Sequence, residues 1–457
     1  MTRIVRVLAV PASGGYYYED LAALQERHIP VEERYSTPAV TPGFRFVREP
    51  AEAVSVGLVL DDGQVAWGDC VGVAYSGKAG RFPPFRTAEG LAVIQQVVAP
   101  FLEGRSVTSF REQAGGLDAL RQVVEERRPL PRPPRAQRLS RREFLTAPAR
   151  LLVPEEEPPM ETVRQERPLH PAVHYGVTQA LLRAVAMVRR QTMAEVIAEE
   201  WGVPAPEAPV PIHAQCGSDR YHGADKMIAR RLASLPHALV DDIDEQLGPN
   251  GARLIQYARW LRARVEALGG PDYRPTIHLD VHGALGKIYN NVLGKVLGDL
   301  YALELAVDPL PLRVESPVIM DTLPAQLEAL RSLRDYIRIR KMRVQIAADE
   351  WANTLEDVRQ FIAVRAADMI QIKMPDMGGI HHTVEAVLAC KAAGIGAFLG
   401  GSCVETDLSA RTAVHVALAT QPAMMLARPG MGVDEAVMIV QNEMARALAC
   451  IRGRRGT

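Results

Sequence analysis

The second half of the chain alternates short apolar runs with longer amphipathic stretches. The stretches, such as residues 251–268 and 324–337, repeat their apolar residues at helical spacing. Strands that alternate with helices in this way predict an α/β fold with a (β/α)8 barrel, which we place at residues 204–457. The predicted strands are residues 211–215, 237–243, 276–281, 312–316, 344–350, 369–373, 396–402 and 424–430.

The first half has a different pattern, typical of an α+β domain. Apolar and polar residues alternate along residues 3–10 and 53–70, which predicts strands, and an Asp-Gly pair within the second stretch predicts a hairpin turn. Residues 87–104 then show an amphipathic helical pattern that ends at a glycine. We therefore predict an N-terminal α+β capping domain over residues 1–203.

Residues 124–168 interrupt this capping domain. Residues 125–144 are dense in arginine and proline, and a run of glutamates and prolines follows at residues 155–159. Such a segment buries little apolar area, so we predict an irregular insertion rather than packed elements. The helical pattern then resumes and predicts one long helix over residues 170–202.

Four successive strands of the predicted barrel end in an ionisable residue. These residues are Asp280, Glu315, Asp349 and Lys373, and the gaps between them are 35, 34 and 24 residues. One βα unit takes roughly 30 residues, so each of the four falls at the C-terminal end of its own strand, where such barrels keep their chemistry. A single acidic residue after a strand is more often a helix cap or a solvated charge, but four in succession favour a site.

The types of these four residues indicate the chemistry of the site. Three carboxylates on adjacent strand ends make an all-oxygen site, which suits Mg²⁺ better than zinc or copper. A lysine beside a divalent cation loses its proton more easily and can act as a base. The pattern therefore predicts that Lys373 removes a proton beside a Mg²⁺ ion held by the three carboxylates.

Composition and charge exclude several other classes of protein. Lysine and arginine number 53 against 54 acidic residues, a net charge of −1, which argues against a general nucleic-acid or membrane-surface role. No apolar run reaches the length that spans a membrane. The five cysteines are far apart and form no CxxC pair, which fits a reducing compartment. We predict a cytoplasmic protein.

Several motifs, in order along both predicted domains, make the chain resemble the 3-methylaspartate ammonia-lyases, a family of the enolase superfamily. The resemblance covers most of the chain but not residues 124–168. In the barrel it is carried by HLDVHG (278–283), VESPV (314–318), AADEW (347–351), QIKMPDMGGIH (371–381), GGSCVET (400–406) and PGMGVDEA (429–436). Further upstream it includes VTPGF (40–44), GDC (68–70), YSGKAGR (75–81), SDRYHGADKM (218–227) and LPHALV (235–240).

The resemblance implies a role for each residue of the predicted site. It implies metal ligands at Asp280, Glu315 and Asp349, and Lys373 as the base. It places His237 across the site from Lys373, as a donor or as a base on the other face of the substrate. The implied substrate contacts are Gln215, Gln371, Ser402 and Cys403.

The same resemblance implies a reaction and a set of partners. The reaction removes a proton next to a carboxylate and expels ammonia from the neighbouring carbon, giving mesaconate from 3-methylaspartate or a close analogue. The doubly charged enolate that forms needs a cation where its charge develops. The implied cofactors are Mg²⁺ and, as a further cation, K⁺. The implied partners are a small dicarboxylate or amino-acid substrate and a second copy of the chain in a homodimer.

Some residues around the expected substrate depart from the family pattern. Ala74 stands where the family has glutamine, and His213 stands where it has an aromatic residue. Phe398 replaces a tyrosine and Ser402 a threonine, whereas Leu426 is retained. Losing a hydrogen-bond partner from a pocket relaxes its selectivity, so we predict that larger amines or a bulkier C3 substituent are accepted.

Two alternatives compete with this interpretation. Another proton abstraction of the enolase superfamily, such as racemisation or dehydration, would use the same metal and base. Those relatives often carry a paired lysine on the second strand, and residues 239–244 hold none. The alternative from a different class is a barrel without catalytic activity, which the complete Asp, Glu, Asp and Lys set disfavours.

Two further features receive no catalytic role from the sequence. The glycine-rich residues 74–81 are interpreted as a surface loop, although Lys78 and Arg81 could meet an anion. His381 and His382 follow a Gly-Gly pair but lack a recognisable metal-ligand spacing.

Overall fold

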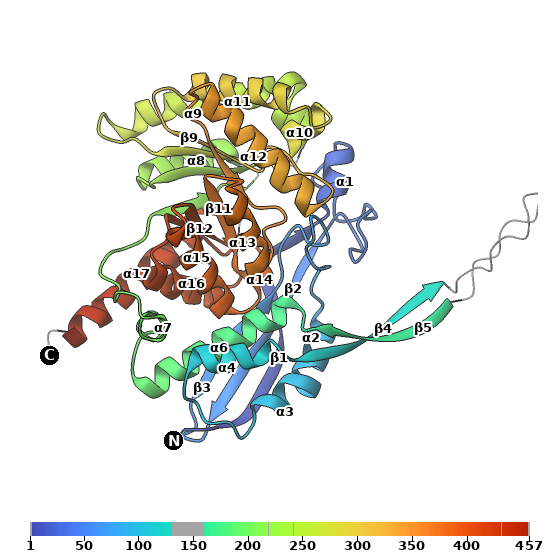
Figure 1. The fold of residues 1–457 in the computed structure, drawn as a ribbon, viewed down its shortest axis with the longest axis vertical. Coiled ribbons are helices and arrows are strands. Elements are labelled where there is room, and N and C mark those ends of the chain that lie inside the picture. Colours follow the sequence, from blue (N-terminus) through green and yellow to red (C-terminus); the bar gives the residue numbers. More distant parts are fainter. Residues whose placement is uncertain (1, 130–159, 218, 241, 431, 456–457) are drawn as a thin grey trace, which may run out of the picture. The chain divides into compact units, whose positions relative to one another are not determined.

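The computed structural model describes residues 2–129, 160–217, 219–240, 242–430 and 432–455 (Figure 1). The chain divides into two compact units, one made of Met1–Asp118 with His170–Thr457 and the other of Ala119–Leu169. This division does not test the boundary expected between the capping and barrel domains, which stays a prediction. Among the described residues, no helix has both the length and the apolar content needed to cross a bilayer.

A closed barrel of eight parallel strands, within the described part of the chain, confirms the predicted fold class. Around the barrel the order is β10-β11-β12-β13-β6-β7-β8-β9, so strands that follow one another in sequence are paired and β13 closes onto β6. The strands are β6 (Ile212–Gln215), β7 (Ser234–Leu239), β8 (Thr276–Asp280), β9 (Leu312–Glu315), β10 (Gln345–Ala348), β11 (Met369–Lys373), β12 (Gly396–Gly400) and β13 (Met424–Ala427).

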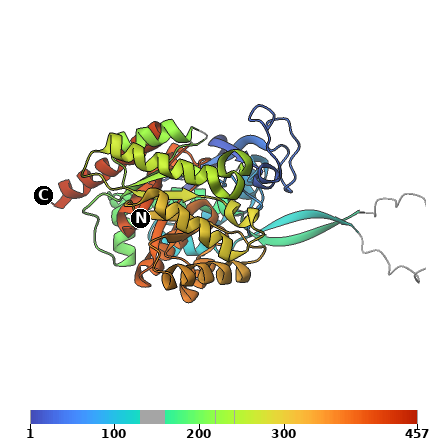
Figure 2. The same cartoon turned by 90° about the horizontal axis from the view of Figure 1, so that it is seen from above.

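Helices follow the barrel strands, and seen from above their green to red segments lie around the strands (Figure 2). Their sequences explain where they begin: Thr354 caps α13 and Thr406 caps α16, each in a reciprocal capping box. The helices are α8 (Arg220–Ala229), α9 (Ala252–Gly269), α10 (Ala284–Ile288), α11 (Leu293–Val307), α12 (Leu323–Ile339), α13 (Leu355–Val364), α14 (Met374–Met377), α15 (Ile380–Ala392), α16 (Asp407–Thr420) and α17 (Val433–Arg455). Short turns η3 (Ile243–Leu247) and η4 (Pro249–Gly251) precede α9.

The second barrel strand was predicted at the wrong place. It was expected at residues 237–243, and β7 instead runs from Ser234 to Leu239. Proline cannot donate a ladder hydrogen bond, so Pro236 suggested that no strand could run through it. The β7–β8 pairing accommodates the proline with a register irregularity between Leu235 and Ala238. His237 nevertheless lies on the strand, as expected.

The N-terminal region of the first unit contains a three-stranded antiparallel sheet, which lies below the barrel in Figure 1. Its strands β1 (Ile4–Glu19), β2 (Arg48–Leu60) and β3 (Val65–Val71) pair in that order, and Gly63 takes a positive φ of 84° in the expected β2–β3 turn. The predicted helix at 87–104 is observed as α2 (Thr87–Val93), a π-helical turn η1 (Ile94–Val98) and α3 (Ala99–Leu102). This part also contains the helices α1 (Leu21–Glu26) and α4 (Phe110–Leu117).

The single long helix expected over residues 170–202 is two helices. α6 (Pro171–Arg189) ends where Arg190 adopts a left-handed conformation, and α7 (Met193–Trp201) starts with a capping box between Thr192 and Glu195. These local signals end one helix and begin the next, although the apolar spacing predicted one continuous helix. α6 packs closely on the sheet, because a Cβ added at Gly68 of β3 would lie 2.2 Å from the Gly176 carbonyl oxygen.

The prediction of an irregular insertion is wrong at both ends of the predicted segment, where the second unit contains strands. β4 (Arg121–Pro129) and β5 (Met160–Pro168) pair along their whole length as an antiparallel hairpin. The prediction rested on how little apolar area the segment can bury, whereas a hairpin ladder is made of backbone hydrogen bonds. The rest of the predicted insertion, residues 130–159, lies outside the described residues.

Candidate active site

A cavity at the C-terminal ends of the barrel strands brings together most of the predicted site residues. The N-terminal region contributes to it, since Glu19 ends β1 and Ala74 and Tyr75 follow β3. The lining residues are Glu19, Ala74, Tyr75, Gln215, His237, Asp280, His282, Gln371, Lys373, Gly401, Ser402 and Cys403.

The three predicted metal-binding carboxylates lie on neighbouring strands. Asp280 and Glu315 are paired in register at the ends of β8 and β9, and Asp349 directly follows β10. All three are buried, with at most 3% of each residue exposed. Burial raises the pKa of Asp280 and of Glu315 well above the usual range, and nearby carboxylates raise both further. A divalent cation would relieve this repulsion, and carboxylate oxygens are the donors that Mg²⁺ prefers.

Asp349 already has two cationic partners. Lys373 Nζ lies 2.7 Å from its Oδ2, and Arg81 Nη2 lies 2.9 Å from its Oδ1. Burial alone would raise the pKa of Asp349, but the charges of Arg81 and Lys373 outweigh it and hold that pKa below the usual range. The predicted base and one predicted metal ligand are therefore in direct contact.

Arg81 corrects the interpretation of residues 74–81 as a plain surface loop. Its side chain is only 1% exposed and its Nε donates to Asp376 Oδ2 at 2.8 Å. The loop is held against the barrel, since Asn353 donates to the Ala79 carbonyl oxygen at 2.7 Å. Gly80, with a φ of 79°, permits this approach. The glycine content of the loop indicated that its backbone could approach another part of the protein closely. The sequence did not show which carboxylates Arg81 contacts, because they are distant along the chain.

His237 and Lys373 lie on opposite sides of the barrel mouth. Their strands, β7 and β11, are four places apart in the closed order of eight strands. His237 Nε2 is 3.5 Å from Asp280 Oδ2, and one possible ligand atom from each of His237, Asp280 and Glu315 lies within 4.8 Å of the others. Burial, followed by the charges of His213 and Lys373, lowers the pKa of His237 well below its usual range. A neutral imidazole on this side can donate a hydrogen bond from one ring nitrogen and accept one at the other.

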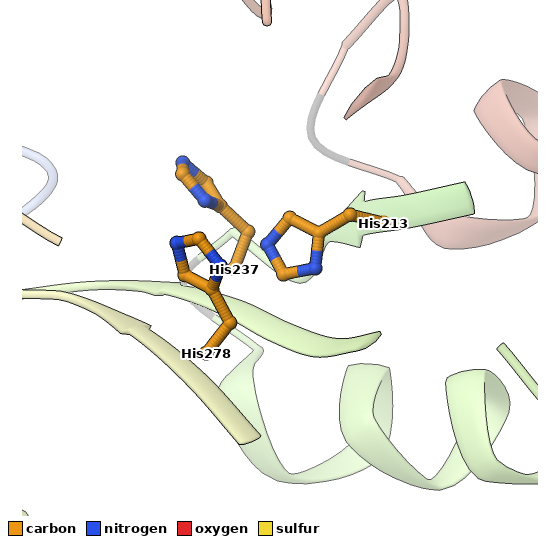
Figure 3. Close-up of side chains that lie close together, drawn as sticks. All are labelled: His213, His237 and His278. Carbon is orange, nitrogen blue, oxygen red and sulfur yellow. The ribbon is translucent and has the colours of Figure 1, made fainter. Parts of the chain in front are cut away.

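Three buried histidines lie together on the adjacent strands β6, β7 and β8 (Figure 3). The ring centroids of His213 and His278 are 4.6 Å apart, and those of His213 and His237 are 5.3 Å apart. His278 Nε2 lies 2.6 Å from Glu315 Oε2 and so orients this carboxylate from below. Burial lowers the pKa of the His213 imidazole to about 3, and a backbone hydrogen bond at Ser234 opposes that change.

The polar residues that were predicted to contact the substrate differ in their hydrogen-bond partners. Gln371 donates to Glu315, while Gln215 Oε1 has no hydrogen-bond partner among the described residues. The Ser402 amide donates to Glu405 Oε2 at 2.9 Å, so it is already used, and Ser402 Oγ accepts from the Ala74 amide at 2.9 Å. Burial raises the pKa of the Cys403 thiol to about 12, which leaves that thiol protonated.

His213, Phe398 and Leu426 do not line the cavity among the described residues. Phe398 and Leu426 pack in a buried apolar cluster with Ala347, Met369 and Met424. His213 is paired with Leu426 in register and precedes the cavity residue Gln215 by two positions. Strand side chains repeat every two residues, so His213 faces inward like Gln215 but lies deeper in the barrel. Of the altered positions, the structure brings Ala74 and Ser402 to the cavity wall.

Glu19, Tyr75 and His282 line the cavity but were given no role from the sequence. Arg48 Nε donates to Glu19 Oε1 at 2.6 Å, and His282 Nε2 is 3.2 Å from Asp280 Oδ2. The rings of Tyr75 and His282 are 5.0 Å apart. Tyr75 and His282 fall within recognised motifs, which was a usable signal. Glu19 ends a long strand of ordinary pattern and offered none.

Comparison with known proteins decides the family. A model of the methylaspartate ammonia-lyase C-terminus matches residues 204–453, and one of the N-terminus matches residues 2–130 and 155–202. The chain is 43% identical to methylaspartate ammonia-lyase 2 of Carboxydothermus hydrogenoformans, over 99% of this chain and all of that protein. The chain belongs to the methylaspartate ammonia-lyase family. It is thus related to carbon–nitrogen lyases, as the sequence motifs implied.

Two solved structures of methylaspartate ammonia-lyases are similar over almost the whole chain. The magnesium complex of β-methylaspartase from Clostridium tetanomorphum is 38% identical with a TM-score of 0.81, covering 99% of this chain and 100% of that one. The Citrobacter amalonaticus enzyme, solved with (2S,3S)-3-methylaspartic acid, is 36% identical with a TM-score of 0.85, covering 98% and 100%.

Arg81 gives a prediction that concerns stability. Arg81→Met should reduce the free energy of unfolding by about 3 kcal/mol, because Asp376 loses its ion-pair partner and Asp349 loses one of two while both stay buried. Chemical denaturation measures this. Lys78→Met, which removes an exposed cation from the same loop, should change stability by less than about 0.5 kcal/mol. Equal stabilities of the two variants would contradict the assigned role of Arg81.

Proposed function

We propose that this chain eliminates ammonia from 3-methylaspartate, or a close analogue, to give mesaconate in a Mg²⁺-dependent reaction. The observation that carries the proposal is the set of three buried carboxylates on adjacent strand ends, with Lys373 and His237 on opposite sides of them. Relatives named methylaspartate ammonia-lyases, similar over the full chain, support the choice of substrate.

Asp280, Glu315 and Asp349 would hold the Mg²⁺ ion. The donor set fits it, since all three offer carboxylate oxygens and the burial of Asp280 and Glu315 leaves their repulsion in need of a cation. When bound, Mg²⁺ supplies positive charge where the substrate carboxylate gains negative charge after proton removal. Gln371 and His278 keep Glu315 in position from two sides. K⁺ stays an expectation from the family resemblance, without assigned ligands.

Lys373 is the base in this proposal and takes the proton from C3 of the substrate. The electron pair of that C–H bond first moves onto the neighbouring carboxylate as an enolate. It then forms the carbon–carbon double bond as the C2–N bond breaks and ammonia leaves. Lys373 is ion-paired with Asp349 here, so it must give up that contact and its own proton to accept the substrate proton. His237, neutral and across the cavity, can donate to the substrate carboxylate or act on the other face.

The remaining expectations belong to the same proposal. We expect a cytoplasmic homodimer that binds a small dicarboxylate or amino acid and neither nucleic acid nor membrane. The division into a capping domain, residues 1–203, and a catalytic barrel, residues 204–457, is supported by two family models that meet between residues 202 and 204. Racemisation or dehydration on the same site is the alternative, and no observation of the structure favours it.

The function is tested by incubating the purified protein and Mg²⁺ with mesaconate, fumarate or ethylfumarate and with ammonia, methylamine or ethylamine. Loss of the absorbance of the conjugated diacid reports addition. We expect addition to mesaconate, and methylamine should be used at a rate comparable to ammonia because Ala74 leaves room and no amide at the wall. No addition with any pair would reject the proposal in favour of the alternative.

Two variants test whether the residue at position 74 sets the preference between amines. Ala74→Gln should restore a preference for ammonia, since this position lines the cavity. Phe398→Tyr is the matched control and should leave the preference unchanged, because Phe398 lies in the deeper apolar cluster. A sharp preference of the parent for ammonia would overturn the wider pocket but not the reaction.

The metal assignment has its own test. Asp280→Asn, Glu315→Gln and Asp349→Asn should each weaken Mg²⁺ binding at least about tenfold, since even losing a support of a ligand costs about 10- to 100-fold. Isothermal titration calorimetry measures this. Asp368→Asn is the control, because Asp368 precedes β11 at the opposite end of that strand and pairs with Arg334. Parental Mg²⁺ affinity in all three site variants would sink the assignment.

A further inference from the structure

A second group of possible metal ligands lies outside the cavity, at the junction of three helices. Asp118 follows α4, His174 lies in α6, and His381 and His382 occupy the first turn of α15. The spacing of the two adjacent histidines along the chain does not by itself indicate a metal site. The fold supplies the missing partners, because α4 and α6 from the N-terminal region reach the start of this barrel helix.

One carboxylate in this group faces three imidazole nitrogens of the same kind. Asp118 Oδ1 lies 3.3 Å from His174 Nε2. Asp118 Oδ2 lies 3.2 Å from His381 Nε2 and 3.1 Å from His382 Nε2. In a tetrahedral zinc site with bonds of about 2.0–2.1 Å, neighbouring ligand atoms are about 3.3 Å apart. The two separations at Asp118 Oδ2 match that edge, and one possible ligand atom from each of Asp118, His381 and His382 lies within 4.8 Å of the others.

One ring is also oriented as metal-binding histidines are. His382 Nδ1 lies 3.4 Å from the Met377 carbonyl oxygen, which can accept an Nδ1 hydrogen. A backbone acceptor on Nδ1 fixes the tautomer and leaves the Nε2 lone pair toward the carboxylate, the arrangement typical of metal-bound histidine.

The charges of the group favour a cation at its centre. His381 Nε2 and His382 Nε2 both lie within hydrogen-bond distance of Asp118 Oδ2, so two imidazole nitrogens and one carboxylate oxygen converge on a position that a proton or a metal ion can occupy. His381 is 5% exposed and His174 is largely buried, which disfavours charged imidazolium forms at both. Asp118 is 40% and His382 28% exposed, so an ion from solvent can reach the site.

We propose that Asp118, His381 and His382 form a site for a divalent ion that prefers imidazole, namely Zn²⁺, with His174 beside it on the other oxygen of Asp118. Two imidazole nitrogens and one carboxylate oxygen are donors that zinc takes, and a water molecule can fill the fourth tetrahedral position, whereas Mg²⁺ takes oxygen ligands. The ion would join the end of α4 to α15, the helix reached from Lys373 through α14. It therefore fastens the N-terminal region beside the connection that carries the base, and it is independent of the proposed reaction.

The test uses the full-length protein, freed of metal with a chelator and then titrated with Zn²⁺ against a chromophoric zinc chelator. The parent should bind Zn²⁺ at this site, and Co²⁺ should give the intense visible absorption of four-coordinate cobalt. His382→Gln should weaken Zn²⁺ binding at least about tenfold, and His381→Asn with His382→Gln should remove the Co²⁺ absorption. Circular dichroism checks that the variants are folded, and the partly exposed His382 makes its single variant the safer one.

Two controls separate this site from others that could take zinc. His222→Gln removes an exposed histidine that lies 3.3 Å from Asp219, and it should leave binding unchanged. Asp280→Asn disturbs the barrel carboxylates and should also leave the Co²⁺ absorption unchanged. A parent that binds no Zn²⁺ would show a hydrogen-bonded cluster only and overturn the proposal. So would binding that survives His382→Gln and the double variant, or that is lost in Asp280→Asn alone.

Discussion

Repulsion among buried carboxylates at the mouth of the barrel is the constraint on which the rest of this structure depends. Asp280, Glu315, Asp349 and Glu350 are all at most 3% exposed and lie close enough to raise one another's pKa in three of the four cases. Burying like charges is costly unless cations and hydrogen bonds compensate. The protein supplies part of the compensating positive charge itself. The negative charge that stays uncompensated makes the site suitable for a bound cation.

The compensation comes from both halves of the first unit. Lys373 belongs to the barrel, but Arg81 arrives from a loop of the N-terminal region and contacts Asp349 and Asp376. Behind the cavity a second buried pair, Glu405 and Arg428, is joined by the Tyr175 hydroxyl, which donates to Glu405 at 2.6 Å. The N-terminal region is thus an electrostatic partner of the barrel, and neither part can form this cavity alone.

The sequence predicts those features that repeat at short range. Strand and helix periodicity located seven of the eight barrel strands closely, and the spacing of ionisable residues placed Asp280, Glu315, Asp349 and Lys373 at their ends. The error at β7 arose because Pro236 is tolerated there through an irregular register. A capping box at Thr192 likewise begins a second helix where apolar spacing alone predicted one continuous helix.

The features that could not be predicted from the sequence depend on how deep a side chain lies in the barrel and on contacts between distant segments. Alternation assigns Phe398 and Leu426 to the inward face of their strands, but it does not say which layer of that face lines a cavity. Arg81 meets Asp349, 268 positions away, and Asp118 meets His382, 264 positions away. No local pattern encodes such pairs, because they are set by how two regions pack.

The central claim is that Lys373 moves a proton at carbon beside the carboxylate site, and isotope exchange tests it most directly. The parent, 3-methylaspartate and Mg²⁺ are incubated in deuterated water, and deuterium at C3 is followed by nuclear magnetic resonance. Exchange should require Mg²⁺ and should fall by about 10²- to 10⁴-fold or more in Lys373→Ala. Exchange at the parental rate in a folded Lys373→Ala variant would contradict the account.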